Sequence, residues 1–368
     1  MKRKYGTMTY TAGASLLSLM LILGGCGSNA AAPQKSGTAA EGSSAAGTSA
    51  EQAPADKLQV EASFYPMYEF ARQVGGDLAD VKLLVPSGTE PHDWEPTPQD
   101  IARIQEADML VYNGSGMESW VEQVLGATSN TELLAVEASK DIDKMEASEE
   151  DGHDHGHEEA DTAEEGHDHD HDAAAEEEHD HAHEGESEEA HDHGGLDPHV
   201  WLSPRLAVQE VHAIEAAFAK ADPDHADQYK SNADAYAAKL EALDSEFKEG
   251  LSGTKRTDFI TQHAAFGYLA RDYGLTQVPI AGLSPDQEPA AGEMSEVVEF
   301  AKEHDVKTIF FETLVSSKVA ETIASEVGAE TSVLNPLEGL TEEEMAAGDD
   351  YLSVMRANLE ALRTALNQ

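Results

Sequence analysis

Short apolar runs alternate with amphipathic segments along most of this chain, beginning at Leu58. Short runs rich in Val, Ile, Leu and Phe are typical of buried strands, while apolar residues that recur every three or four positions predict helices. Alternation of the two argues for parallel sheets covered by helices. The pattern predicts strands at residues 58–64, 81–85, 108–112, 132–136, 258–261, 276–280, 306–311 and 331–334.

Two of the helices between these strands begin with recognisable capping residues. Thr97 is followed by Pro98 and, three positions after the cap, by Asp100, which is a variant of the capping box. Ser203 is followed by Pro204 in the same way. Apolar spacing extends the helix after Ser203 over residues 204–220. It predicts further helices at residues 66–74, 117–125, 224–249, 264–273, 293–303, 316–327 and 349–366.

The helix predicted at residues 224–249 is long enough to organise the architecture. At 1.5 Å per residue it would extend about 39 Å, which is sufficient to run across two lobes. We therefore predict an α/β protein of two lobes, each with a mostly parallel four-stranded sheet flanked by helices, joined by one long rigid helix. The predicted limits are 57–222 for the N-terminal lobe, 223–250 for the bridging helix and 251–368 for the C-terminal lobe.

The first 56 residues show neither the short apolar runs of the strands nor the apolar spacing of the helices. A basic start precedes an apolar stretch that is too short for a comfortable transmembrane helix, and Leu-Gly-Gly-Cys then resembles a bacterial lipobox. The resemblance implies a signal peptide at residues 1–25 and lipidation of Cys26, with a leftover core cysteine as the alternative. Residues 26–56, rich in Ala, Ser, Gly and Thr, predict a flexible tether. A single cysteine leaves no disulfide and no thiolate metal site.

The charge of the chain indicates a positively charged partner. The formal net charge is −49 at pH 7, and residues 146–193 hold 22 acidic residues and no Lys or Arg. Removing these 22 negative charges still leaves −27. The balance rules against nucleic acid as a partner, because phosphate backbones attract basic surfaces, and it suits the capture of cations.

Eleven of the 17 histidines lie in one acidic segment, the His-rich loop, predicted at residues 141–195. Few apolar side chains larger than Ala occur there, so we expect disorder. Its imidazoles and carboxylates predict additional weak metal sites that gather metal ions or report their supply; the alternative is a solvated acidic spacer. The histidines are His153, His155, His157, His167, His169, His171, His179, His181, His183, His191 and His193.

Three other histidines share a context that predicts a metal site. His92 and His263 each follow a predicted strand, one in each lobe, and His199 lies in the turn before a helix. In open α/β sheets, ligands bind at the carboxyl ends of strands, so this site would lie between the lobes. A proline precedes both His92 and His199 and restricts the backbone, which lowers the entropy lost on binding. The histidines expected at the surface are His212, His225 and His304.

The motifs around the three histidines resemble those of the zinc/manganese solute-binding proteins of ABC importers. They are Glu-Pro-His-Asp-Trp-Glu-Pro at 90–96, Asp-Pro-His-Val-Trp-Leu at 197–202 and Thr-Gln-His-Ala-Ala-Phe-Gly-Tyr at 261–268. The resemblance runs from about residue 58 to the C-terminus, with a His-rich insertion where zinc members tend to carry one. It implies two lobes bridged by a rigid helix, one metal site between them, and delivery of the ion to a membrane permease.

The ligand types favour zinc. Three neutral imidazoles suit Zn²⁺, Cu²⁺ or Ni²⁺, whereas Mn²⁺ sites usually contain carboxylate ligands. The manganese branch of the family typically has a carboxylate where this chain has His263, which resembles the zinc branch. Glu338 aligns by motif with the family's carboxylate of the second lobe and is the expected fourth ligand. Glu312, at the end of a predicted strand, either replaces it or orients a ligating imidazole, and water is a third possibility.

These observations predict a monomeric zinc receptor, anchored by lipid on the extracellular face of the cytoplasmic membrane of a Gram-positive cell. One alternative is a metal-buffering or adhesin-like surface lipoprotein. The other is a zinc hydrolase, which requires an open coordination position, but the chain has no His-Glu-x-x-His helix and no separate acid or base stands out. Because ligation needs neutral imidazoles, we expect the affinity to fall below about pH 6 to 7.

Overall fold

The computed structural model describes residues 57–146 and 195–368. Three predicted features lie outside these residues: the signal peptide, the tether with Cys26, and the eleven histidines of the His-rich loop. Among the described residues, no helix is both long and apolar enough to cross a membrane.

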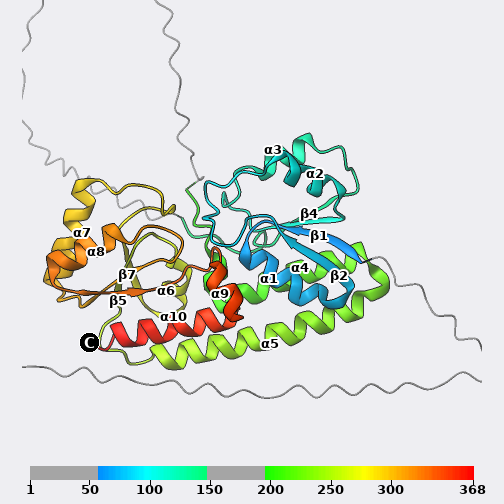
Figure 1. The fold of residues 1–368 in the computed structure, drawn as a ribbon. Coiled ribbons are helices and arrows are strands. Elements are labelled where there is room, and N and C mark those ends of the chain that lie inside the picture. The colour runs from blue at the N-terminus through cyan, green and yellow to red at the C-terminus, as the bar shows by residue number, and fades with distance from the viewer. Residues whose placement is uncertain (1–56, 147–194) are drawn as a thin grey trace, which may run out of the picture. The chain divides into compact units, whose positions relative to one another are not determined.

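The N-terminal lobe contains a parallel sheet of four short strands. Hydrogen bonds place them in the order β2-β1-β3-β4, so the chain extends the sheet first on one side of β1 and then on the other. In such a sheet a crevice forms at the carboxyl ends of the strands where the order reverses, here β1 and β3. The strands are β1 (Leu58–Ala62), β2 (Ala79–Leu83), β3 (Met109–Tyr112) and β4 (Leu134–Glu137) (Figure 1).

The C-terminal lobe repeats this topology. Its four parallel strands have the order β6-β5-β7-β8, with the reversal between β5 and β7. The predicted pair of parallel four-stranded sheets is therefore confirmed. The strands are β5 (Asp258–Thr261), β6 (Thr276–Pro279), β7 (Thr308–Phe311) and β8 (Glu330–Val333).

Helices flank both sheets, and the predicted caps are present. The side chain of Thr97 accepts the Asp100 N–H in a capping box, and that of Ser203 accepts the Leu206 N–H. The helices are α1 (Tyr65–Gly75), α2 (Pro98–Glu106), α3 (Val121–Ala127), α4 (Pro204–Ala221), α5 (Ala226–Leu251), α6 (Gly267–Tyr273), α7 (Ala291–Glu303), α8 (Lys318–Val327), α9 (Glu342–Ala347) and α10 (Tyr351–Ala365), with 3₁₀ turns η1 (Gly76–Leu78), η2 (Val200–Leu202) and η3 (Pro223–His225).

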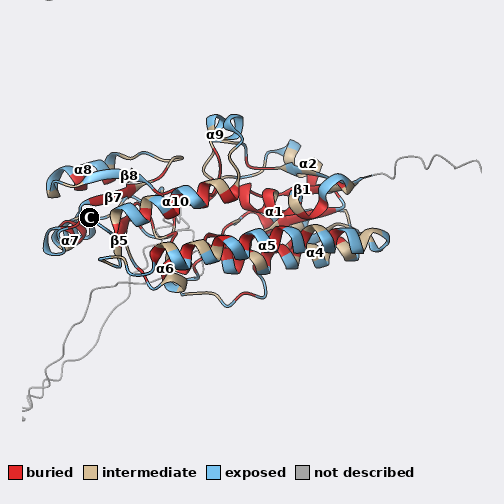
Figure 2. Cartoon of the chain, turned by 90° about the horizontal axis from the view of Figure 1, so that it is seen from below, coloured by how far each residue is buried: buried red, intermediate tan, exposed pale blue. Residues whose placement is uncertain are grey.

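The long helix α5 contacts elements of both lobes. It has 26 residues and packs against α1 and α4 on the N-terminal side and against α6 and α10 on the C-terminal side. Figure 2 shows its buried face turned toward these neighbours. The large side chains of this face recur at helical spacing, and all are buried: Tyr229, Tyr236, Leu240, Leu243 and Phe247.

Several element limits differ from the expected pattern; helix α3, for example, begins at Val121 instead of residue 117. Helix α6 begins at Gly267 instead of residue 264, because the His263 carbonyl, which would accept the first intrahelical bond, accepts from Thr261 Oγ1 and Gln277 Nε2 instead. Helix α9 was not predicted, although Thr341 and Glu344 form its capping box. Residues 141–146, assigned to the His-rich loop by sequence, pack against the protein: Ile142 is buried with Val200, Leu206 and Tyr268, and Glu146 forms an antiparallel bridge with Leu196.

Candidate metal centre

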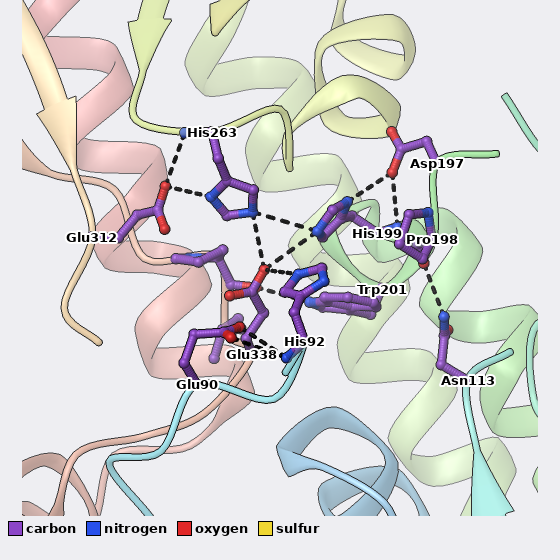
Figure 3. A network of polar contacts seen from close by, with 12 residues as sticks. Glu90, His92, Asn113, Asp197, Pro198, His199, Trp201, His263, Glu312 and Glu338 are labelled. Atoms are coloured by element: carbon purple, nitrogen blue, oxygen red, sulfur yellow. Dashed lines mark hydrogen bonds and ion pairs between the residues drawn. The ribbon is translucent and has the colours of Figure 1, made fainter. Parts of the chain in front are cut away.

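Three histidines and one glutamate meet at the ends of strands from both lobes (Figure 3). His92 lies in the loop after β2, His199 immediately before η2, His263 just after β5, and Glu338 in the segment after β8. All four are buried, with 0 to 5% of their surface exposed. They are the only described residues that form a group of His, Cys, Asp or Glu spaced to hold a metal ion.

The side-chain atoms face one another at the spacing of a tetrahedral site. Glu338 Oε1 lies 3.4 Å from His92 Nε2, 3.3 Å from His199 Nε2 and 3.1 Å from His263 Nε2. The Nε2 atoms of His199 and His263 are 3.4 Å apart. Metal–nitrogen bonds of about 2.0–2.1 Å at tetrahedral angles separate ligand atoms by about 3.3 Å. The four side chains therefore fit a four-coordinate ion with little rearrangement.

Carboxylates hold two of the imidazoles from behind. Asp197 Oδ1 lies 2.8 Å from His199 Nδ1 and accepts the His199 backbone N–H at 2.9 Å. Glu312 Oε1 lies 2.6 Å from His263 Nδ1 and accepts the His263 backbone N–H at 3.2 Å. Each carboxylate favours a proton on Nδ1, fixes the orientation of the ring, and leaves Nε2 as the atom that ligates.

The buried charges of the centre depend on one another. Burial alone would lower the pKa of His263, but the charges of Glu312 and Glu338 raise it well above its usual value. Burial also opposes ionisation of Glu338, yet the positive charge of His263 holds the pKa of Glu338 well below its usual range. Burial lowers the pKa of His92. These opposite shifts favour an ion pair between protonated His263 and ionised Glu338.

The structure gives different places to the two glutamates that the sequence left as alternatives. Glu338 places an oxygen among three Nε2 atoms, whereas Glu312 contacts the opposite nitrogen of His263. Sequence reasoning missed Asp197 as the partner of His199. The available signal was Asp-Pro-His itself, because an Asp side chain commonly accepts the backbone N–H two residues later.

The other residues considered from sequence lie away from this centre or pack beside it. His212 and His304 are exposed, and His225 pairs with Asp222 at 2.7 Å. Trp201 is fully buried, with its ring centroid 5.2 Å from that of His199, and it shields that imidazole from water. Its counterpart Trp94 packs against Trp120, with ring centroids 5.6 Å apart.

The family described as the periplasmic component A of the zinc-uptake complex matches residues 60–365. The chain belongs to this family. A relative from Bacillus subtilis (strain 168), described as the high-affinity zinc uptake system protein ZnuA, is 50% identical over 311 residues, which are 84% of this chain and 88% of the relative.

Two streptococcal comparisons agree with the family. The zinc-binding lipoprotein AdcA of Streptococcus pneumoniae serotype 4 is 42% identical over 312 residues, which are 85% of this chain but 56% of AdcA. The chain thus spans about half of that relative. The crystal structure of the Zn(II)-bound ZnuA-like domain of AdcA has a TM-score of 0.65 and 39% identity, and covers 85% of this chain and 100% of the domain.

Proposed function

We propose that this protein is the zinc receptor of an ABC importer, which captures Zn²⁺ with His92, His199, His263 and Glu338 and delivers it to a membrane permease. The observation that carries the proposal is the convergence of three buried Nε2 atoms on one carboxylate oxygen. Glu338 Oε1 lies 3.1–3.4 Å from each Nε2 atom, and the Nε2 atoms of His199 and His263 are 3.4 Å apart. Membership of a zinc-uptake family and the Zn(II)-bound relative of the same fold support it. Zinc is the cargo of this protein.

The donor set selects among divalent ions. Three imidazoles and one carboxylate in a tetrahedral arrangement suit Zn²⁺, whereas Mn²⁺ prefers more oxygen ligands and higher coordination. Cu²⁺ binds nitrogen donors more strongly than Zn²⁺ but favours tetragonal geometry. The buried tetrahedral site therefore discriminates strongly against Mn²⁺ and less strongly against Cu²⁺.

A fourth protein ligand favours transport over hydrolysis. Catalytic zinc sites keep one position for water, which the metal activates. In this proposal Glu338 Oε1 takes the fourth position, and the carboxylates of Asp197 and Glu312 contact the ring nitrogens that face away from it. A passive surface buffer would have no need for a single buried site of this geometry between two lobes.

The location of the receptor follows from its N-terminal sequence. We propose that lipid attached to Cys26 holds the protein on the outer face of the cytoplasmic membrane. Residues 26–56 would then act as a tether that lets a monomeric receptor reach its permease. Such an anchor retains a receptor on a Gram-positive cell, which has no outer membrane.

A competition titration tests the proposed function. We expect the full chain to hold one zinc equivalent against a strong chelator, and a large excess of Mn²⁺ to displace little of it. The matched variant lacks residues 147–194; a short linker can join its ends because Glu146 and Leu196 are bridged. It should keep the tight equivalent and lose only weak ones. Loss of the tight equivalent in this variant would show that the His-rich loop, and not the buried centre, provides the tight zinc binding.

Removing the charge behind His199 should weaken this site. We expect Asp197→Asn to raise the zinc dissociation constant about 10- to 100-fold, the usual effect of losing a partner of a ligating imidazole. Asp222→Asn is the matched control, because Asp222 makes the same Asp–His contact with His225 far from the centre. Isothermal titration with a competing chelator measures both. Equal affinities for the two variants would contradict the role assigned to Asp197.

A further inference from the structure

The segment that carries Glu338 is fixed by two buried asparagines. The Asn335 N–H donates to Asn358 Oδ1 at 2.9 Å, and Asn358 Nδ2 donates to Asn335 O at 2.7 Å. This reciprocal pair joins the segment after β8 to helix α10. Asn335 and Asn358 are only 3% and 2% exposed, so water cannot readily replace these bonds.

Asn335 also shapes the backbone immediately before Glu338. Its Oδ1 accepts the Leu337 N–H at 2.8 Å, and its Nδ2 donates to Thr313 Oγ1 and to Glu344 Oε1. Leu337 has a φ of 57°, in the left-handed region that bulky residues rarely adopt. A residue stays there only where its surroundings impose the conformation, and such residues cluster at ligand-holding sites.

The N-terminal lobe contacts the same segment on both sides of Glu338. Trp201 Nε1 donates to Pro336 O at 2.8 Å, and the Gly88 N–H donates to Leu340 O at 2.9 Å. The backbone from residue 335 to residue 340 is therefore bonded to both lobes. None of these bonds uses the Glu338 carboxylate, which remains directed at the three imidazoles.

We infer that Asn335 and Asn358 are positioning residues that hold Glu338 Oε1 in place as the fourth zinc ligand and thereby set the affinity for zinc. The inference rests on the proposed function. Neither asparagine is in the ligand set; they act through the backbone of Pro336 and Leu337. A ligand held in its bound position costs less ordering entropy when the ion arrives, so loosening this segment should weaken binding.

A double-mutant cycle on the full chain separates positioning from general stability. Zinc affinity is measured by chelator competition for the wild type, Asn358→Ala, Glu338→Ala and the double variant. We expect Asn358→Ala alone to weaken binding about 10- to 100-fold. In the Glu338→Ala background the same substitution should change the affinity by less than about twofold, because the positioned ligand is already gone.

Two further variants keep the test decisive. Asn335→Ala runs through the same cycle and leaves α10 intact, so the result does not depend on one variant folding. Asn232→Ala is the matched control, because Asn232 Nδ2 donates to Val74 O at 2.9 Å, outside the Glu338 segment, and should leave zinc affinity unchanged.

Three other outcomes would reject the positioning role of the asparagines, the ligand role of Glu338, or both. An equal loss in both Glu338 backgrounds would show a general structural effect and reject the positioning role. Full affinity of Asn358→Ala and Asn335→Ala, beside a large loss in Glu338→Ala, would reject this inference and leave the proposed zinc site standing. Full affinity of Glu338→Ala would reject the ligand role of Glu338 and the inference together.

Discussion

Replacing His263 by alanine should abolish tight zinc capture. His263 Nε2 is 3.1 Å from Glu338 Oε1 and 3.4 Å from His199 Nε2, so the substitution removes one corner of the tetrahedron. It also leaves the buried carboxylates of Glu312 and Glu338 without their nearest positive partner. Losing only an outer partner of a ligating imidazole costs about 10- to 100-fold in metal affinity, and losing the ligand itself should cost more. The dissociation constant should therefore rise by at least about 100-fold.

The measurement needs a control that removes an imidazole without touching the centre. His212→Ala serves this purpose, because His212 is exposed on α4. Competition against a chelator of known affinity should give wild-type binding for His212→Ala. Circular dichroism and the unfolding midpoint of the metal-free proteins show whether His263→Ala still folds. A folded His263→Ala variant that binds zinc within threefold of the wild type would exclude His263 from the ligand set.

The sequence predicts the fold well because its signals are local and repeated. Short apolar runs predict the strands and apolar residues every three or four positions predict the helices, and each pattern appears eight or more times in this chain. The errors occur where a non-local bond decides the backbone. Helix α6 starts late because the His263 carbonyl accepts from Gln277 Nε2, 14 positions away, and from Thr261 Oγ1, so it is not available for the first intrahelical bond.

The candidate site is predictable only in part. His92, His199 and His263 have local signals, in proline-containing turns or at the ends of strands. Deciding whether Glu338 or Glu312 is the fourth ligand requires the relative orientation of three loops, and the spacing of apolar residues in the sequence does not give that orientation. The structure separates them through different nitrogens of one imidazole, His263 Nε2 for Glu338 and Nδ1 for Glu312.

The asparagine pair behind Glu338 illustrates what sequence reasoning could not reach. Asn335 lies in a Pro-containing turn and Asn358 lies in the middle of α10, where an Asn is ordinarily read as a surface residue. Their reciprocal bonds span 23 positions. Only the packing of α10 against the end of β8 brings them together, so neither residue has a local signal of its role.

Zinc affinity should depend steeply on pH over a range that lies higher than an unperturbed histidine would give. Burial alone would lower the pKa of His199, but its hydrogen bonds to Asp197 and Glu338 raise it. Against the same effect of burial, Glu312 and Glu338 raise the pKa of His263 well above its usual value. The metal-free protein should therefore hold protons on His199 and His263 up to a higher pH than free imidazoles would.

The sign of the effect follows from proton counting. The metal-free state binds two more protons than the zinc-bound state while the pH is below both raised pKa values, so zinc must displace them. Each displaced proton makes the dissociation constant rise about tenfold for each pH unit of acidification. While both imidazoles hold their protons, we expect binding to weaken about 100-fold for each pH unit of acidification. Once His199 has lost its proton the dependence should decline to about tenfold per unit, and the raised pKa values should move the onset of the loss above the range of pH 6 to 7 expected from the sequence.

Glu312→Gln tests the physical origin of this slope. The substitution removes the charge beside His263 Nδ1, so the pKa of His263 should fall and less than two protons should be displaced near neutral pH. The slope of log Kd against pH between 6 and 8 should then be shallower than in the wild type. Glu326→Gln is the matched control, because Glu326 pairs with Lys302 on the surface. A wild-type slope near zero would show that the imidazoles are already neutral, and an unchanged slope in Glu312→Gln would show that Glu312 does not hold the proton on His263.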